Sequence, residues 1–251
     1  MQNKEIKKFY DDFLDSRMLG YRLYGNKRID LATKFILKNV KKNDNVLEIG
    51  CGIGIVTERV ARKLKYGHIW AFDISDRNIW YAKKTVKNRN VDFFVADVLS
   101  DFNLLKNKIS SPVNVFLLID VIEHIPKNKH IELFNSLLSI ASESASFLLT
   151  FPSEFYQRYL KENNPDELQI IDEEISMKDI LLICEHNNLF IKYFEMKNVW
   201  MYNQYVHCLI STKRPIQKLN YDMHFIHFLS KVINKIKLPY NKRKYIKEIF
   251  K

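Results

Sequence analysis

An apolar run that ends in a glycine-rich loop constrains the fold of this chain more than any other feature. Residues 45–49 lead into three glycines at alternate positions, Gly50, Gly52 and Gly54, and residues 55–64 follow with helical periodicity. A short apolar run of this kind predicts a buried strand. Glycine allows the backbone to turn sharply and to approach a ligand closely, because it has no Cβ. The strand, loop and helix together predict a site for a nucleoside-bearing cofactor.

The spacing of the glycines separates this loop from the dinucleotide-binding fingerprint. From Glu48 to Gly54 the pattern is E-x-G-x-G-x-G, whereas the fingerprint G-x-G-x-x-G would place a glycine or alanine at position 55. Position 55 is Ile. The loop therefore argues against a nicotinamide or flavin cofactor.

Acidic residues follow the next predicted strands at the points where each strand ends. Residues 68–72 end at Asp73, residues 91–95 are followed by Asp97, and residues 115–119 end at Asp120. Functional side chains at the carboxyl ends of successive strands are expected for an open parallel α/β sheet, and an acid at the position of Asp73 can accept hydrogen bonds from ribose hydroxyls. Each acid alone has a structural alternative, such as capping the next helix.

With these residues, the chain resembles the class I S-adenosylmethionine-dependent methyltransferases of the small-molecule type, over about residues 26–212. The resemblance implies a Rossmann-like α/β fold: a mostly parallel seven-stranded sheet with an antiparallel edge hairpin and helices on both faces. It implies S-adenosylmethionine as cofactor and S-adenosylhomocysteine as product, with the glycine loop at the methionine portion and Asp97 at the adenine amino group. The cofactor-binding residues that it implies are Glu48, Gly50, Cys51, Gly52, Gly54, Asp73, Ile74, Asp97, Val98 and Asp120.

The segment after the fourth strand is the best candidate for the catalytic side of the site. Residues 120–126 resemble the Glu-His-Ile/Val-Pro segment of many small-molecule methyltransferases. A histidine has the pKa for general-base work, so His124 is the first candidate base and His207 the second. The alternatives are local packing for His124 and burial on a strand face for His207. Asp120 alone does not make a metal site, and we expect none.

A polar and aromatic insert follows the fifth strand, residues 146–151, and is expected to roof the acceptor pocket. The candidate substrate contacts are Tyr156, Arg158, Tyr159 and Gln169 in the insert, and Gln204 beside the last strand. The alternative is a surface helix and loop whose polar side chains only meet water.

Three function classes remain open at this stage. The first is O-methylation of a small polar metabolite, such as a sugar or a nucleotide-linked intermediate. Both neutral and anionic acceptors are included in this class. The second is methylation of a nitrogen, an RNA or another macromolecule. The Asn/Asp-Pro-Pro-Tyr motif of nucleic-acid N-methyltransferases is absent after strand four, and no nucleic-acid module is recognisable, which argues against a nucleic-acid partner. The third is a non-catalytic cofactor-binding scaffold, against which the intact glycines and acids argue.

The chain divides into three predicted parts. Residues 1–40 form a helical cover, with helices at 4–15 and 27–39 joined by the aromatic stretch 17–24. Tyr10, Tyr21 and Tyr24 either line this cover or pack on the domain. Residues 41–212 form the cofactor-binding domain. Its last two strands, 189–197 and 205–211, are too close for a crossover helix and are expected to form the hairpin.

Residues 213–251 form a basic extension. They contain eleven Lys or Arg and two acidic residues, a formal +9 out of the +11 of the whole chain, and apolar residues at helical spacing. Three roles compete for this amphipathic segment: packing on the domain or in a homodimer, contact with an anionic membrane surface, and attraction of an anionic substrate.

The remaining composition agrees with a cytoplasmic protein. No apolar run reaches the roughly eighteen residues of a membrane span, and the first residues, MQNKEIKKFYDDF, lack the apolar stretch of a secretory signal. The three cysteines form no C-x-x-C pair, so neither disulfides nor a zinc site are expected.

Overall fold

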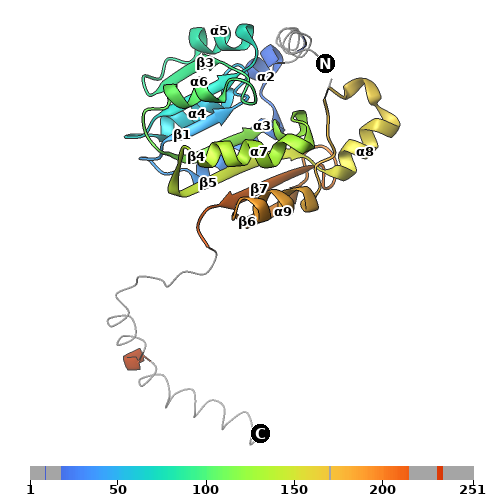
Figure 1. Cartoon of the computed structure of the whole chain (residues 1–251). Helices are drawn as coiled ribbons and strands as arrows, with labels where there is room; N and C mark the ends of the chain where they lie inside the picture. Colours follow the sequence, from blue (N-terminus) through green and yellow to red (C-terminus); the bar gives the residue numbers. More distant parts are fainter. Residues whose placement is uncertain (1–8, 10–17, 170, 215–230, 234–251) are drawn as a thin grey trace, which may run out of the picture. The chain divides into compact units, whose positions relative to one another are not determined.

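A seven-stranded sheet organises the computed structural model, with strand order β3-β2-β1-β4-β5-β7-β6 (Figure 1). The strands are β1 Val46–Ile49, β2 Ile69–Asp73, β3 Val91–Val95, β4 Val113–Ile119, β5 Ala141–Pro152, β6 Phe190–Lys197 and β7 Tyr205–Ser211. Strands β1 to β5 pair in parallel, and β7 is antiparallel to both β5 and β6. The predicted fold and edge hairpin are confirmed.

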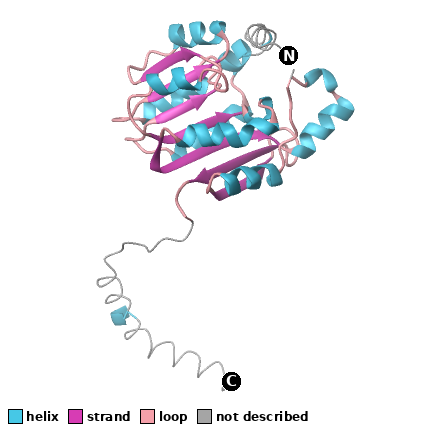
Figure 2. Ribbon diagram, viewed as in Figure 1, coloured by secondary structure: helices cyan, strands magenta, loops and turns pink. Residues whose placement is uncertain are grey.

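Helices cover both faces of this sheet (Figure 2). The helical elements are α2 Leu19–Tyr24, α3 Lys27–Asn39, α4 Ile55–Lys63, α5 Asp76–Thr85, α6 Phe102–Lys108, η2 Ile122–His124, α7 Lys127–Leu138, α8 Glu154–Asn163, η3 Pro165–Glu167 and α9 Met177–His186. Neighbouring strand residues face opposite cores: Val46 packs with residues of α3, α4 and α5, and Leu47 with residues of α6, α7 and α9. Burial on both faces explains why the central strands read as continuous apolar runs.

The strand order reverses between β1 and β4, which are neighbours in the sheet. The loops that follow these two strands leave a crevice at the carboxyl edge, where open α/β sheets bind their ligands. The glycine loop follows β1, and the segment that contains Asp120 and His124 follows β4. The fold therefore places both predicted motifs at one end of the sheet.

The stretch 17–24, which we expected to be a connection, contains the helix α2. Gly25 ends this helix with φ 78°, and its N–H donates to the carbonyl oxygen of Tyr21. Asn26 then begins α3, because its side-chain oxygen accepts from the N–H groups of Arg28 and Ile29. Sequence periodicity missed the short α2 since six residues carry little of it.

The structure describes Phe9 and residues 18–169, 171–214 and 231–233. Contacts divide the chain into the units Met1–Arg214 and Pro215–Lys251. Apart from Phe9, the predicted helix at 4–15 with Tyr10 lies outside the described residues, and so does most of the predicted amphipathic helix in the basic extension. In the described part of the chain, no helix has the length and apolar character needed to cross a membrane.

Candidate active site

The glycine loop after β1 has a backbone that only glycine adopts without strain. Gly50, Gly52 and Gly54 have φ of 69°, 52° and 76°, in the left-handed region. A Cβ added at Gly50 would lie 2.5 Å from Cγ2 of Val121, in the segment after β4. The loop is therefore built for close approach between the segments that follow β1 and β4.

A cavity of about 460 Å³ lies against this loop. Of the ten residues that the sequence assigned to the cofactor, all except Gly54 line it: Glu48, Gly50, Cys51, Gly52, Asp73, Ile74, Asp97, Val98 and Asp120. Gly54 instead begins α4 as its N-cap residue. The cavity volume is in the range of small-molecule and cofactor sites.

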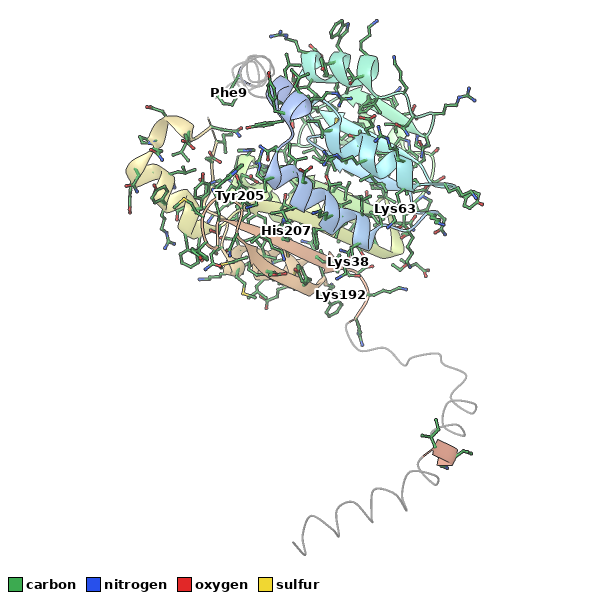
Figure 3. All side chains as sticks on the ribbon, turned by 180° about the vertical axis from the view of Figure 1, so that it is seen from behind. Phe9, Lys38, Lys63, Lys192, Tyr205 and His207 are labelled. Atoms are coloured by element: carbon green, nitrogen blue, oxygen red, sulfur yellow. The ribbon has the colours of Figure 1, made fainter. Side chains whose placement is uncertain are left out.

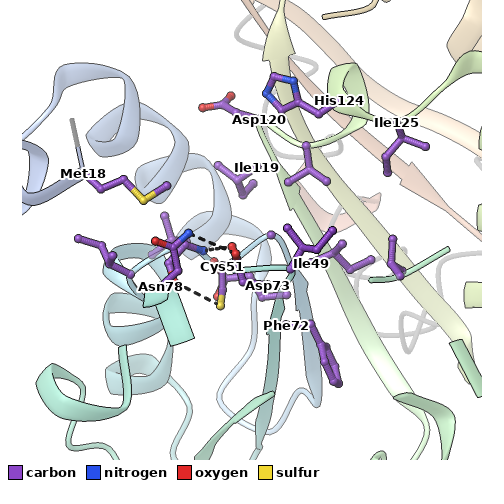
Figure 4. Close-up of a pocket in the computed structure, with 18 of the residues that line it drawn as sticks. Met18, Ile49, Cys51, Phe72, Asp73, Asn78, Ile119, Asp120, His124 and Ile125 are labelled. Atoms are coloured by element: carbon purple, nitrogen blue, oxygen red, sulfur yellow. Dashed lines mark hydrogen bonds between the residues drawn. The ribbon is translucent and has the colours of Figure 1, made fainter. Parts of the chain in front are cut away.

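The sequence did not assign three further residues of this wall: Met18, Arg28 and Asn78. Met18 precedes α2, and Tyr21 of the same helix also lines the cavity, whereas Tyr24 is 89% exposed. The described end of the predicted cover thus contributes side chains to the site. Asn78 lies in α5, and Figure 4 shows it hydrogen-bonded to Asp73 beside Cys51, with Asp120 and His124 across the cavity.

Asp73 connects the glycine loop to α5. Its Oδ2 accepts from the Gly52 N–H at 2.8 Å, and its Oδ1 accepts from the Ser75 N–H at 2.9 Å and from Asn78 Nδ2 at 3.2 Å. Ser75 caps α5 by accepting from the Asn78 N–H at 3.1 Å. Ser75 thus provides the capping that the sequence considered as an alternative role, and the carboxylate of Asp73 still lies on the cavity wall.

Two oxygens of this wall are buried and have no hydrogen-bond partner among the described residues: Glu48 Oε2 and Asn78 Oδ1. Burial raises the pKa of Glu48 to about 8, an effect that Thr57 opposes and Asp73 reinforces. Asp97, which also lines the cavity, is held by a tight turn in which its Oδ1 accepts from the Leu99 N–H at 2.9 Å. Glu48, Asn78 and Asp97 thus place polar side chains along the wall of the cavity.

A second cavity of about 190 Å³ adjoins the first. Four residues line both cavities: Tyr21, Arg28, His124 and Gln169. The remaining wall of the second cavity consists of Glu123, Pro152, Tyr156, Gln157, Leu160, Glu167, Asp172, Trp200 and Tyr205. We call the two the large and the small cavity. Helix α8, which follows β5, supplies part of the small cavity, as expected for a roof over an acceptor.

Arg28 and Asp120 form an ion pair at the junction of the two cavities. Asp120 has a φ of 55°, unusual for a residue other than glycine, and its Oδ1 accepts from Thr150 Oγ1 at 3.0 Å. The guanidinium carbon of Arg28 lies 5.4 Å from the ring centre of Tyr205. Asp120 is therefore held by β5 on one side and by α3 on the other.

His124 lies at the same junction, with one ring nitrogen fixed by the backbone. Its Nδ1 is 2.7 Å from the carbonyl oxygen of Ile171 and 3.5 Å from Oδ1 of Asp172. A carbonyl oxygen can only accept, so Nδ1 carries the hydrogen and the neutral ring has its lone pair on Nε2. Burial lowers the pKa of His124, and Asp172 opposes that shift. The ring is thus neutral and basic at Nε2 near pH 7.

The other candidate base, His207, does not reach either cavity. It pairs with Thr150 of β5 and Glu195 of β6, and its ring stacks on Phe35 of α3 at 5.0 Å (Figure 3). Its side chain is 3% exposed and its Nδ1 has no partner among the described residues. Burial lowers its pKa to about 4. The register of β7 turns His207 toward α3, which matches the alternative of burial on a strand face.

Of the five candidate substrate contacts, the structure brings Tyr156 and Gln169 to the small cavity. Arg158 is not on either cavity wall, because it pairs with Glu154 and Glu174 on an exposed face, and Tyr159 of the same helix is 38% exposed. Gln204 is buried, and its Oε1 accepts from the N–H groups of Trp200 and Met201. Arg158 matches the alternative of a surface helix, and Gln204 holds the turn before β7.

Comparison with known proteins adds sequence and fold relatives. The model of the methyltransferase small domain family matches residues 21–110. Ribosomal protein L11 methyltransferase of Thermotoga neapolitana is 36% identical over 97 residues, which are 36% of this chain and 36% of that protein. Ribosomal RNA small subunit methyltransferase C of Buchnera aphidicola subsp. Cinara cedri is 31% identical over 107 residues, 42% of this chain and 25% of its own length. The chain thus spans well under half of the length of these relatives.

Solved structures match over most of the chain. The S-adenosylhomocysteine complex of magnesium protoporphyrin IX methyltransferase from Synechocystis PCC 6803 has a TM-score of 0.63 and 16% identity, covering 83% of this chain and 98% of that one. An S-adenosylmethionine-dependent methyltransferase from Clostridium acetobutylicum has a TM-score of 0.60 and 15% identity, covering 79% and 98%. At these identities the likeness establishes the fold, and it agrees with the resemblance inferred from the motifs.

Proposed function

We propose, from the premise that this chain belongs to the class I S-adenosylmethionine-dependent methyltransferases, that it transfers a methyl group to an oxygen of a small polar acceptor. One observation carries the proposal: the large cavity on the glycine loop and the small polar cavity meet at His124. A methyltransferase needs a donor site and an acceptor site that adjoin, so that the reacting atoms are aligned.

The large cavity fits the cofactor by its own chemistry. The left-handed glycines leave room for a ligand, Glu48 and Asn78 line the wall, and Asn78 Oδ1 is a buried acceptor that lacks a donor among the described residues. Glu48 and the loop would hold the methionine portion, Asp73 and Asn78 the ribose, and Asp97 the adenine amino group. Met18 and Tyr21 would exclude water from above.

The cofactor supplies a methyl group that its sulfonium charge already activates. The chain must then position the acceptor and take up its proton. His124 holds a hydrogen on Nδ1 and would accept the hydroxyl proton of the acceptor at Nε2. The carbonyl of Ile171 fixes the ring orientation, and Asp172 stabilises the charged ring that results, since it lies 3.5 Å from Nδ1.

A macromolecular acceptor is the second candidate, because the relatives named above act by name on a ribosomal protein and on ribosomal RNA. These names run against our expectation that nucleic acid is not a partner. Against a macromolecular acceptor, the aligned regions cover only 36% and 42% of this chain, and the small cavity of about 190 Å³ is sized for a single group.

Transfer of a radioactive methyl group distinguishes the two candidates. The protein is incubated with methyl-labelled S-adenosylmethionine and, in separate reactions, the small-molecule fraction of a cell extract or salt-washed ribosomes. We expect acid-soluble labelled product with the wild type and little with Asp73→Ala. Label that appears only in acid-precipitable RNA or protein would replace the small-molecule proposal by the second candidate, and no label in either reaction would contradict methyl transfer.

A further inference from the structure

Three buried side-chain oxygens that have no hydrogen-bond partner among the described residues belong to residues that line the small cavity: Glu123 Oε2, Gln157 Oε1 and Gln169 Oε1. Glu123 comes from η2, Gln157 from α8 and Gln169 from the segment that follows η3. The side chains of Glu123 and Gln157 are each 1% exposed. Buried polar atoms in folded proteins nearly always pair with protein or ordered water, so three such oxygens in the wall of one cavity indicate where a ligand that brings donors would bind.

The partners that these side chains already have explain why their acceptors are left over. Gln157 donates through Nε2 to Oδ1 of Asp172 at 3.1 Å, which points its amide oxygen elsewhere. Asp172 is further occupied at Oδ2 by the N–H of Gln169 at 2.8 Å. Donors of the wall thus pair within it, and three acceptor oxygens are left without donors. The ligand that completes this arrangement must bring hydrogen-bond donors.

The ionisable residues of the wall are mostly acidic. Glu123, Glu167 and Asp172 line the small cavity, and its only Lys or Arg among the described residues is Arg28. Arg28 is already paired with Asp120, so it offers little charge to a ligand. An anionic acceptor, which the sequence alone left open, would be repelled by these acidic residues.

Aromatic rings complete the wall. The rings of Tyr156 and Tyr205 lie 6.0 Å apart at 46°, and Trp200 is 59% exposed at the rim. Aromatic faces attract cations as well as the apolar faces of small ring compounds. The cavity therefore combines acceptor oxygens, negative charge and aromatic faces.

Resting on the proposed function, we propose that the acceptor is a small amine, whose ammonium group is bound by the oxygens of Glu123, Gln157 and Gln169. An ammonium group has three donors and no acceptor, which matches three acceptors without donors. Neutral polyols bring hydrogen-bond donors but no positive charge. Carboxylates and phosphates bring neither donors nor a positive charge.

The protonation of Glu123 supports this assignment. Burial, with Asp120 and Asp172, raises the pKa of Glu123 well above its ordinary value, while Arg28 opposes the shift. A neutral Glu123 avoids an isolated buried charge in the wall. A bound ammonium supplies the opposite charge and favours the ionised carboxylate, so the group is suited to a ligand that is itself cationic.

Three hexoses of matched size and different charge test the proposal: glucosamine, glucose and glucuronate. Their binding to the wild type is measured by calorimetry at pH 7, with and without saturating S-adenosylhomocysteine. A charge-assisted hydrogen bond predicts that glucosamine binds at least about tenfold more tightly than glucose, and that glucuronate binds more weakly than glucose. Because the series is also run without the product, failure to bind S-adenosylhomocysteine counts against the proposed function alone.

Variants assign the preference to the wall. Glu123→Gln keeps the side-chain shape and is expected to reduce the preference for glucosamine to about threefold or less, whereas Glu132→Gln, the same change on the exposed face of α7, should leave it unchanged. Gln169→Leu, at a less buried position, should also weaken glucosamine binding, and it serves as the test if Glu123→Gln does not fold.

Three results would overturn the proposal. They are equal affinity for the three hexoses, a preference for glucuronate, and no binding of any of them at 50 mM, which is roughly the millimolar limit of a weak site.

Discussion

Replacing Gly50 by alanine tests whether the glycine loop is as tightly built as the structure indicates. The backbone of Gly50 has φ 69°, and a left-handed conformation costs an L-residue roughly 1–2 kcal/mol. The new Cβ would also lie 2.5 Å from Val121 Cγ2, an overpacked contact that typically costs about 1–3 kcal/mol. We therefore expect Gly50→Ala to lower the free energy of unfolding by about 2–5 kcal/mol.

Urea denaturation of four proteins separates the two contributions: wild type, Gly50→Ala, Val121→Ala and the double variant. Truncating Val121 removes the Cγ2 atom that the new Cβ meets, so the double variant should recover about 1–3 kcal/mol relative to the sum of the single changes. The backbone strain at Gly50 should remain. Gly20→Ala is the matched control, because Gly20 lies inside α2 with a negative φ, and no atom of the described residues lies within 4 Å of the added Cβ.

The control should be neutral or stabilising by up to about 1 kcal/mol, since alanine favours a helix over glycine. Two results would refute the reasoning. One is a Gly50→Ala protein within about 0.5 kcal/mol of the wild type, which is the range of an ordinary surface change. The other is a double variant whose two effects simply add, which would mean that the loop and the segment after β4 do not approach each other as described.

Three further predictions concern the candidate base, the buried histidine and the basic extension. His124→Ala should lower the turnover rate by about 10²–10⁴-fold with nearly unchanged affinity for S-adenosylhomocysteine. The control His186→Ala, at an exposed position at the end of α9, should match the wild type. As the pH is lowered, the wild-type turnover rate should drop around a midpoint below 6.5, because the pKa of His124 is lowered and protonation removes the base. The pKa of His207 is about 4 in the folded protein against an ordinary 6.5, so the unfolded chain binds more protons between these two pH values. Stability that is present above pH 6.5 is therefore lost as the pH falls toward 4. In urea titrations over this window, the free energy of unfolding of the wild type should fall by up to about 3 kcal/mol more than that of His207→Phe. We propose that residues 213–251 pack through their apolar stripe on the domain or on a second copy, so deletion of 215–251 should lower the melting temperature or abolish a dimer; an unchanged melting temperature with lost binding to anionic vesicles would favour the membrane role instead.

The central strands β1, β2 and β4 were predictable because burial on both faces makes each one a short apolar run bounded by turn residues. Val91–Val95 and Tyr205–Ser211 have the predicted bounds, and the acids after the strands follow from the topology. The cofactor wall was predictable for the same reason: Glu48, Asp73 and Asp97 each occupy a fixed place at a strand end.

The acceptor side was less predictable, because its residues meet only through space. Arg28 stands in the first turn of α3 with no local pattern that links it to Asp120, and Gln157 resembles any polar residue of a surface helix. The sequence chose His207 over such residues since it stands in a strand near the expected rim. Pairing register turned it toward Phe35 instead, and register is not visible in one sequence.

The central claim is that the large cavity binds the nucleoside cofactor, and calorimetric titration with S-adenosylhomocysteine tests it most directly. The wild type should bind, and Asp73→Ala should bind about 10- to 150-fold more weakly, because a hydrogen bond to a charged group contributes roughly 1.5–3 kcal/mol. The control Asp92→Ala removes an exposed carboxylate of β3 that pairs with His68, and it should bind as the wild type does. Absence of binding to the wild type, or equal affinity in the wild type and Asp73→Ala, would contradict the account.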